Sequence, residues 1–269
     1  MAFRPRKPAG RGKQSEDQGR HLAEEVAGML GHELRTPLTV LYTCLQLLSR
    51  VLPRDANDPA RQYLDEAIVE ARHMNVLTNQ LLLAARIQAG ELDLVRERFD
   101  LTSFARNVVD HTQPLARGQR LELAAASDVL PVWADWQHLD IALRNVLINA
   151  IDYAPGTERI RVQLRRAGEQ AVIAVQDFGP GVQPQRLEHL GDPFYQTPRT
   201  DRPSRGGLGL GLFLARAITE LHGGRFEVDC QEGQGCTFTM CLPLAVAAEQ
   251  RVSEPVAAPA RAVQRRFLT

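Results

Sequence analysis

Residues 139–154 read Leu-Asp-Ile-Ala-Leu-Arg-Asn-Val-Leu-Ile-Asn-Ala-Ile-Asp-Tyr-Ala, a strongly apolar stretch that predicts a helix packed into a core. Two asparagines, Asn145 and Asn149, are four residues apart and therefore share one face of that helix. Unpaired amides are costly on so apolar a helix, so we expect a ligand or water to satisfy both. The alternative is that both serve as caps or make hydrogen bonds within the core.

The segments on either side of this helix show mixed strand and helix patterns. They predict an α+β sandwich over residues 100–244, separate from the N-terminal part of the chain. The expected helices are 101–115 and 207–221, and the expected strands are 120–124, 159–165, 171–177, 225–228 and 237–242. Ahead of them, residues 91–99 are expected to form a linker with a short strand.

Two amphipathic helices precede the sandwich. One apolar stripe has steps of four, four, three, four and three, and it consists of Leu30, Leu34, Leu38, Leu41, Leu45 and Leu48. A Pro- and Asp-rich break at 53–59 separates it from a second stripe that ends at Gly90 and consists of Leu64, Ile68, Ala71, Met74, Leu81 and Ala85. A lone helical hairpin buries one side of each stripe, so we expect two chains to form a four-helix bundle.

The composition excludes several classes of protein. The chain has 269 residues, with 32 Lys and Arg against 32 Asp and Glu, and this zero net charge argues against a dedicated nucleic-acid binder. No stretch has the length of a membrane span or the layout of a signal peptide, so we expect a cytoplasmic protein. Residues 1–20 form a basic arm and 245–269 a tail rich in Ala, Pro and Arg. We interpret both as flexible, solvated segments, with contact of the arm to anionic lipid or nucleic acid as the alternative.

The four cysteines, Cys44, Cys230, Cys236 and Cys241, lack C-x-x-C spacing and are too few for a disulfide scaffold. They favour a reducing compartment, and we interpret them as small apolar fillers in or near strands and the first helix. A redox role is the alternative.

His32 lies about 200° around the helix from the stripe residues Leu30 and Leu34, at roughly 100° per residue, and so faces solvent. Glu33 is adjacent, Thr36 lies one turn on, and Pro37 should kink the helix. An exposed histidine beside a carboxylate has the parts of a nucleophile and its base.

The run His-Glu-Leu-Arg-Thr-Pro-Leu at 32–38 closely resembles the phosphoacceptor motif of sensor histidine kinases of two-component systems. The resemblance continues in family order to about residue 244. Residues 145–153 resemble the N box, 177–181 the first glycine box, 193–195 the F box and 207–212 the second glycine box, and 222–243 resemble the closing strands. This resemblance implies a dimerising hairpin at 21–90, a linker at 91–99 and an ATP-binding domain of the Bergerat (GHKL) type at 100–244.

It also implies ATP and Mg²⁺ as cofactors. Asn149 would ligate Mg²⁺, which prefers oxygen, and Asn145 would be a second polar contact to the nucleotide. Asp177 would accept a hydrogen bond from the adenine amino group, and Gly179 and Gly181 would let the backbone approach the base without a Cβ clash. Phosphates would meet the backbone of Gly207, Gly209 and Gly211 ahead of a helix N-terminus. Tyr153 and Phe194 complete the expected nucleotide contacts.

The resemblance further implies an autokinase that passes its phosphoryl group from His32, with Glu33 as base, to an aspartate of a response regulator's receiver domain. Thr36 would orient water when the chain acts as a phosphatase of that regulator. A homodimer and a separate sensor or input protein are the other expected partners, and no nucleic acid is expected. The alternatives are a non-catalytic dimeric regulator that binds a partner kinase or regulator, and a related ATPase or serine kinase of the same nucleotide fold.

Three positions depart from the family pattern. Asp152 stands where Lys or Arg is frequent, near the phosphates, while Leu208 replaces a frequent Thr and Gly31 a frequent Ser. Between the F box and the second glycine box, residues 196–205 would form the lid over ATP. Arginines in this segment have the chemistry to reach phosphate oxygens, the alternative being solvated loop residues; they are Arg199, Arg202 and Arg205.

Overall fold

The computed structural model describes residues 38–51, 59–116, 118–125, 129–196 and 207–245. The chain divides into two compact units, with the main boundary between Asp93 and Leu94, and the described residues 207–210 group with the first unit. In the described part of the chain, no helix combines the length and the apolar character needed to cross a membrane.

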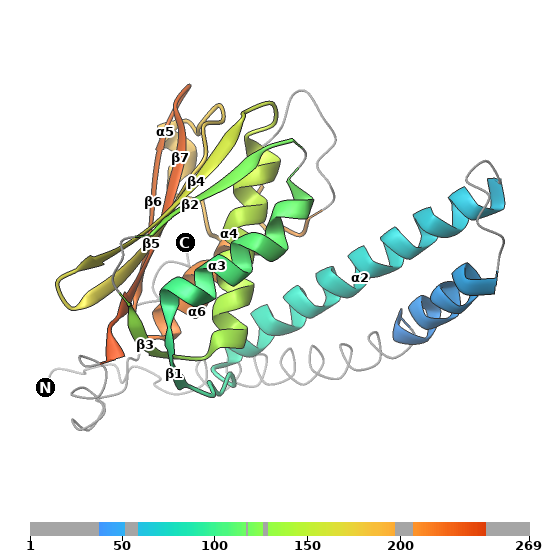
Figure 1. Cartoon of the computed structure of the whole chain (residues 1–269), viewed down its shortest axis with the longest axis horizontal. Coiled ribbons are helices and arrows are strands. Elements are labelled where there is room, and N and C mark those ends of the chain that lie inside the picture. The colour runs from blue at the N-terminus through green and yellow to red at the C-terminus, as the bar shows by residue number, and fades with distance from the viewer. Residues whose placement is uncertain (1–37, 52–58, 117, 126–128, 197–206, 246–269) are drawn as a thin grey trace, which may run out of the picture. The chain divides into compact units, whose positions relative to one another are not determined.

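The first unit contains the expected pair of helices (Figure 1). Residues 38–51 are helical, and α2 runs from Pro59 to Ala89. The second helix ends where predicted, because Gly90 adopts a φ of 75° in the left-handed region and its N–H donates to the Ile87 carbonyl. Arg72 reaches across to the first helix, where its Nη2 donates to the Tyr42 hydroxyl at 2.9 Å.

The apolar stripes of this hairpin are half covered within one chain. Leu38 and Leu64 are buried, with 8% and 7% of their surface exposed. Other stripe residues stay roughly half exposed, namely Leu41, Leu48, Met74 and Leu81. The uncovered half of each stripe is the surface that a second copy of the hairpin would bury.

The second unit is a sheet with helices on one face (Figure 1). Five strands pair in the order β2-β4-β5-β7-β6, with β2 parallel to β4 and the other pairs antiparallel. The strands are β2 (Arg120–Ala125), β4 (Arg159–Ala167), β5 (Gln170–Gln176), β6 (Arg225–Gln231) and β7 (Gly235–Pro243). The covering helices are α3 (Leu101–Thr112), α4 (Trp136–Tyr153) and α6 (Gly211–Leu221). The core lies between these two layers, where Leu143, Val146, Leu147 and Ile218 are fully buried.

Several element boundaries differ from those expected from the sequence. The helix α4 begins three residues early, at Trp136, because the Asp135 carboxylate caps it by accepting from the backbone N–H groups of Gln137 and His138. The helix α6 begins at Gly211 and not at Gly207, since Gly209 has a φ of 71° that no helix continues through.

Of four further short elements, three were not expected as such. Strands β1 (Glu97–Asp100) and β3 (Pro131–Ala134) form a separate two-stranded sheet, of which only β1 falls in a segment predicted to hold a short strand. A 3-10 turn, η1 (Gln113–Leu115), ends the predicted 101–115 helix, and α5 (Pro184–Leu187) is a single helical turn.

The interpretation of all four cysteines as apolar fillers is wrong for three of them. Cys230 and Cys236 form a disulfide, because the register of β6 and β7 places them directly opposite each other with their Cα atoms 4.1 Å apart. Cys44 is exposed on the first helix. Cys241 alone is a buried free thiol in a strand, as expected.

Candidate nucleotide site

The Asp177 side chain is the most constrained of the expected site groups. It follows β5 directly and is 3% exposed. Its Oδ1 accepts two backbone N–H groups, from Gly179 at 2.9 Å and from Cys236 at 3.2 Å. Its Oδ2 has no hydrogen-bond partner among the described residues. Because it is also not among their fully buried polar atoms, this oxygen is accessible from outside. One carboxylate oxygen is therefore fixed by the fold, and the other remains available to a donor from outside.

Burial raises the pKa of the Asp177 carboxyl above its ordinary value, and the N–H bonds from Gly179 and Cys236 oppose this only in part. The folded protein thus disfavours the charged form of this group. A ligand N–H that donates to Oδ2 would stabilise that charge, because hydrogen bonds to ionised groups are among the stronger ones.

The glycines after Asp177 are required by the protein's own backbone. A Cβ atom on Gly179 would lie 2.6 Å from the carbonyl oxygen of Tyr153, at the end of α4. Gly181 has a φ of 67°, and a Cβ there would overlap the carbonyl oxygen of Gln231. We expected these glycines to make room for a base. That role stays a prediction, and the close approaches that the structure contains are to α4 and to the turn between β6 and β7.

The two asparagines of α4 are half-buried and have different surroundings. The Asn145 Nδ2 donates to the Ile141 carbonyl at 2.9 Å, so its own helix provides one partner. A Cβ atom on Gly211, the first residue of α6, would lie 3.2 Å from Asn145 Oδ1. The expectation that an outside group must satisfy both amides is therefore wrong for Asn145. The Asn149 amide makes no hydrogen bond within the described residues and keeps an oxygen for a ligand.

The remaining expected contacts are less closely tied to Asp177. Tyr153 lies half-buried in the last turn of α4. Phe194 is 58% exposed and is the one non-glycine among the described residues with a positive φ, 65°. A residue held in this costly conformation fits a functional segment. Gly209 also has a positive φ, and a Cβ on Gly207 would meet no described atom within 4 Å.

His32, Glu33, Thr36 and all of the predicted lid at 196–205 except Gln196 lie outside the described residues. Among the described residues, no group of three His, Cys, Asp or Glu side chains is arranged to hold a metal ion. Asn149 is thus the metal-ligand candidate within the described site, since an amide oxygen suits a hard cation such as Mg²⁺.

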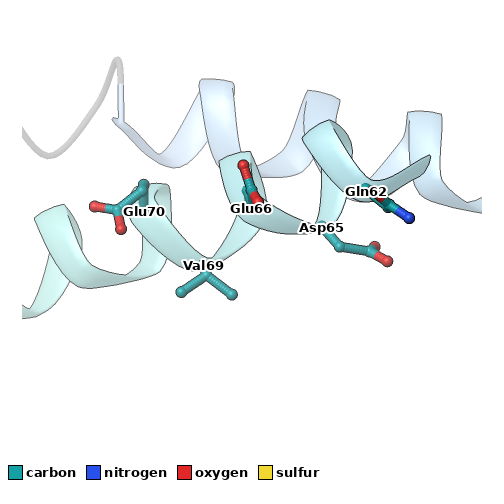
Figure 2. A pocket seen from close by; sticks show the side chains of 5 residues that line it. All are labelled: Gln62, Asp65, Glu66, Val69 and Glu70. Carbon is teal, nitrogen blue, oxygen red and sulfur yellow. The ribbon is translucent and has the colours of Figure 1, made fainter. Parts of the chain in front are cut away.

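The hairpin carries a separate surface hollow on α2. It is lined by residues of that helix alone, as Figure 2 shows: Gln62, Asp65, Glu66, Val69 and Glu70. Asp65 is paired with Arg61 at 3.4 Å, and Glu70 lies 3.8 Å from His73. None of the residues expected to bind nucleotide belongs to this hollow.

Sequence reasoning missed the part that Cys236 has in the site. Its backbone N–H holds Asp177 Oδ1, and its carbonyl accepts from the Asp177 N–H at 2.9 Å. Gly235 was missed as well, although a Cβ there would overlap the Asp177 carbonyl oxygen. The available signal was a pair of cysteines flanking a short turn between two predicted strands.

Comparison with known proteins agrees with this arrangement. Residues 22–90 match the family model of the His Kinase A (phospho-acceptor) domain. Residues 134–246 match the model of the histidine kinase-, DNA gyrase B- and HSP90-like ATPases. The two models thus match a large part of each unit.

Individual relatives give the same result. The chain is 31% identical to the circadian input-output histidine kinase CikA of Synechococcus elongatus, over 86% of this chain and 31% of that protein. It is 33% identical to the alginate biosynthesis sensor protein KinB of Pseudomonas aeruginosa, over 79% of this chain and 36% of that protein. The crystal structure of full-length ShkA in complex with AMPPNP superposes with a TM-score of 0.68 at 27% identity, covering 82% of this chain and 46% of that one.

The fold and the site thus define a phosphoacceptor hairpin followed by an ATPase-type α/β domain. The chain belongs to the sensor histidine kinases of two-component systems. It spans about a third of the length of the two curated relatives described above.

Proposed function

We propose that this chain is an ATP-dependent protein-histidine kinase that phosphorylates itself on His32 and passes the phosphoryl group to an aspartate of a response regulator. Its family and the presence of both required domains support this activity. The observation that carries the proposal is the Asp177 carboxylate, with Oδ1 fixed by two N–H groups and Oδ2 left as an acceptor.

In the proposed complex, Asp177 Oδ2 accepts a hydrogen bond from the adenine amino group. Gly179 and Gly181 keep this loop packed on α4 and on the β6–β7 turn, so the acceptor is held in place before ATP arrives. Tyr153 and Phe194 contribute to the walls of the nucleotide site. The phosphates lie against the glycine backbone that precedes α6, at Gly207, Gly209 and Gly211, because the dipole at a helix N-terminus favours an anion.

Mg²⁺ would neutralise charge on the phosphates during transfer. Asn149 provides an amide oxygen for it, and Asn145 provides a further polar contact at the edge of the site.

At the phosphoacceptor helix, the His32 imidazole attacks the γ-phosphorus of ATP and ADP leaves. The imidazole loses its ring proton to Glu33, whose carboxylate both positions the ring and accepts the proton. Thr36 orients the water that hydrolyses the acyl phosphate of the regulator when the chain acts as a phosphatase.

The hairpin family implies a homodimer, and the half-covered apolar stripes of the helices support one. We propose a cytoplasmic location for the domains described, a response regulator as phosphoryl acceptor, and a separate sensor or input protein. Within the part of the chain that the structure describes, no feature favours the alternative of a non-catalytic regulator.

Binding of ATP through Asp177 is tested by calorimetric titration of Mg²⁺ and a non-hydrolysable ATP analogue into wild type and Asp177→Asn. The asparagine keeps the shape and still accepts the two backbone N–H groups, but it presents an NH₂ group where Oδ2 was. A hydrogen bond to a charged group contributes about 1.5–3 kcal/mol, so affinity should fall roughly tenfold to a hundredfold.

Asp229→Asn is the matched control, because Asp229 is exposed on the edge strand β6, which β7 separates from β5. It should bind the analogue like wild type. Equal affinities for wild type and Asp177→Asn would rule out Asp177 as the adenine contact.

A further inference from the structure

The turn between β6 and β7 is closed by a covalent bond. Cys230 is the penultimate residue of β6, Cys236 is the second residue of β7, and the disulfide encloses residues 231–235. We call residues 230–236 the cysteine hairpin. Because β6 is an edge strand and Cys230 is only half-buried, one sulfur of the bond lies at an accessible border of the sheet.

The cysteine hairpin packs against the loop that begins at Asp177. The Gly233 N–H donates to the Pro180 carbonyl at 2.7 Å. A Cβ on Gly235 would lie 2.9 Å from the Phe178 Cα, so the two backbones are in direct contact. Further along the loop, Gly181 makes a still closer approach to the carbonyl oxygen of Gln231. Three separate contacts therefore make the position of the Asp177 loop depend on the shape of this hairpin.

A fourth contact joins the disulfide to the carboxylate itself. The Cys236 N–H donates to Asp177 Oδ1 at 3.2 Å, and the Asp177 N–H donates to the Cys236 carbonyl at 2.9 Å. The same residue, Cys236, therefore contributes both a sulfur of the disulfide and the N–H that fixes the Asp177 carboxylate. Any change in the backbone at Cys236 is therefore transmitted directly to the orientation of Oδ2.

We propose that Cys230 and Cys236 form a reversible redox modification site whose oxidation state sets the affinity of the nucleotide site. This inference rests on the proposed ATP binding at Asp177. In the oxidised state the crosslink holds the cysteine hairpin in the conformation that orients Asp177. In the reduced state the enclosed residues regain conformational freedom, and the acceptor is less well positioned when the nucleotide arrives.

The reaction is thiol–disulfide exchange with a low-molecular-weight disulfide, such as oxidised glutathione. The Cys230 thiolate attacks one sulfur of the oxidant and releases one thiol, giving a mixed disulfide. The Cys236 thiolate then attacks the Cys230 sulfur and releases the second thiol. The two cysteines lose two electrons and two protons, and the oxidant is reduced to two thiols. In a reducing compartment, a disulfide of this kind is typically transient and regulatory.

The test compares the full chain after equilibration with oxidised glutathione and after reduction with dithiothreitol. Mass spectrometry measures the Cys230–Cys236 bond, and calorimetry measures the Kd for Mg²⁺ with a non-hydrolysable ATP analogue. The reduced protein should bind the analogue about threefold to tenfold more weakly, as expected for a hydrogen-bond acceptor that is loosened but not removed.

Two variants assign the effect to this pair. Cys230→Ser leaves the Cys236 backbone in place, and it should bind like reduced wild type under both conditions. The double variant Cys44→Ser with Cys241→Ser removes the two free thiols, and it should keep the full difference between the oxidised and reduced states.

The inference is overturned if oxidised glutathione does not produce the Cys230–Cys236 bond. It is equally overturned if the bond forms and both states bind the analogue with the same Kd. Absence of binding in both states would instead contradict the proposed function, and this inference with it.

Discussion

The carboxyl group of Asp177 is held where its charge is disfavoured before any ligand is present. Burial raises its pKa above the ordinary value for aspartate, although the Gly179 and Cys236 N–H groups oppose that shift. The folded protein therefore binds a proton at this site more readily than the unfolded chain does. The ionised carboxylate lowers the stability of the fold at neutral pH, and this cost disappears as the pH falls below the pKa of the unfolded chain.

Asp177→Asn should therefore raise the thermal midpoint of the nucleotide-free protein at neutral pH while it weakens ATP binding. The amide carries no charge, so the difference in midpoint from wild type should shrink as the pH falls through the titration of Asp177. Thermal unfolding of both proteins across the acid range measures this. A midpoint that is lower for the variant at neutral pH would contradict the assigned cost of burial.

Asp152 is the residue at which this chain departs most clearly from its family. It lies half-buried in the last turn of α4, three residues after Asn149 and therefore on a neighbouring part of the same face. If it faces the phosphates, repulsion of about 1 kcal/mol remains after screening, and Asp152→Lys should tighten ATP binding several-fold. Calorimetry at low salt measures the change. An unchanged Kd would place the Asp152 side chain outside the phosphate site.

At the residue level, motifs locate side chains better than backbone groups. Asp177, Asn149 and the glycines could be proposed from the sequence because their side chains, or the lack of one, match the family pattern. Cys236 was not, because it acts on Asp177 through its N–H, which every residue type except proline possesses. Only the strand register brings that N–H to the carboxylate.

Among the elements, those with a long hydrophobic period were predicted best. The hydrophobic period and the helix stop at Gly90 predicted where α2 ends. The apolar spacing of residues 139–154 predicted both ends of α4 to within a few residues. Strand β3 has four residues and begins with a proline, so it has too short a pattern to predict. The disulfide could not be predicted from the sequence either, since the pairing of cysteines depends on which residues of β6 and β7 lie opposite each other.

The start of α4 depends on one buried carboxylate. Asp135 is 3% exposed, and its Oδ1 accepts from the N–H groups of Gln137 and His138, each at 3.0 Å. Its Oδ2 accepts from the Val95 N–H at 2.9 Å, which fixes the chain just ahead of β1. Burial acts to raise the pKa of Asp135, but the hydrogen bonds outweigh it and hold the pKa below the ordinary value.

Asp135→Ala should destabilise the α/β unit by about 2–4 kcal/mol, since it removes a helix cap and leaves the Val95 N–H without its acceptor. This stabilisation is present above the unfolded pKa of aspartate and is lost as the pH falls through the lower folded pKa. Urea unfolding at neutral and acid pH measures it. Asp140→Ala is the control, because it breaks only an i,i+4 pair with Arg144 and should cost less than about 0.5 kcal/mol. Equal losses for the two variants would contradict the capping role.

At the scale of the whole molecule, the chain separates its two chemical tasks. The proposed phosphoacceptor His32 falls within the hairpin family match, and the proposed nucleotide residues Asp177, Asn145 and Asn149 belong to the α/β unit. A substitution in the hairpin should therefore abolish phosphorylation without preventing ATP binding. This separation distinguishes an autokinase from an ATPase that uses water as its acceptor.

The most direct measurement is incubation of the full chain with Mg²⁺ and ATP labelled on the γ-phosphate, for wild type and His32→Gln. The wild type should acquire a protein-bound label that is lost in acid and retained in base, as expected for phosphohistidine. The His32→Gln variant should acquire none, yet bind the non-hydrolysable ATP analogue with the wild-type Kd. Label retained by His32→Gln, or a wild-type label that survives acid, would contradict the account of this chain as a kinase acting on His32.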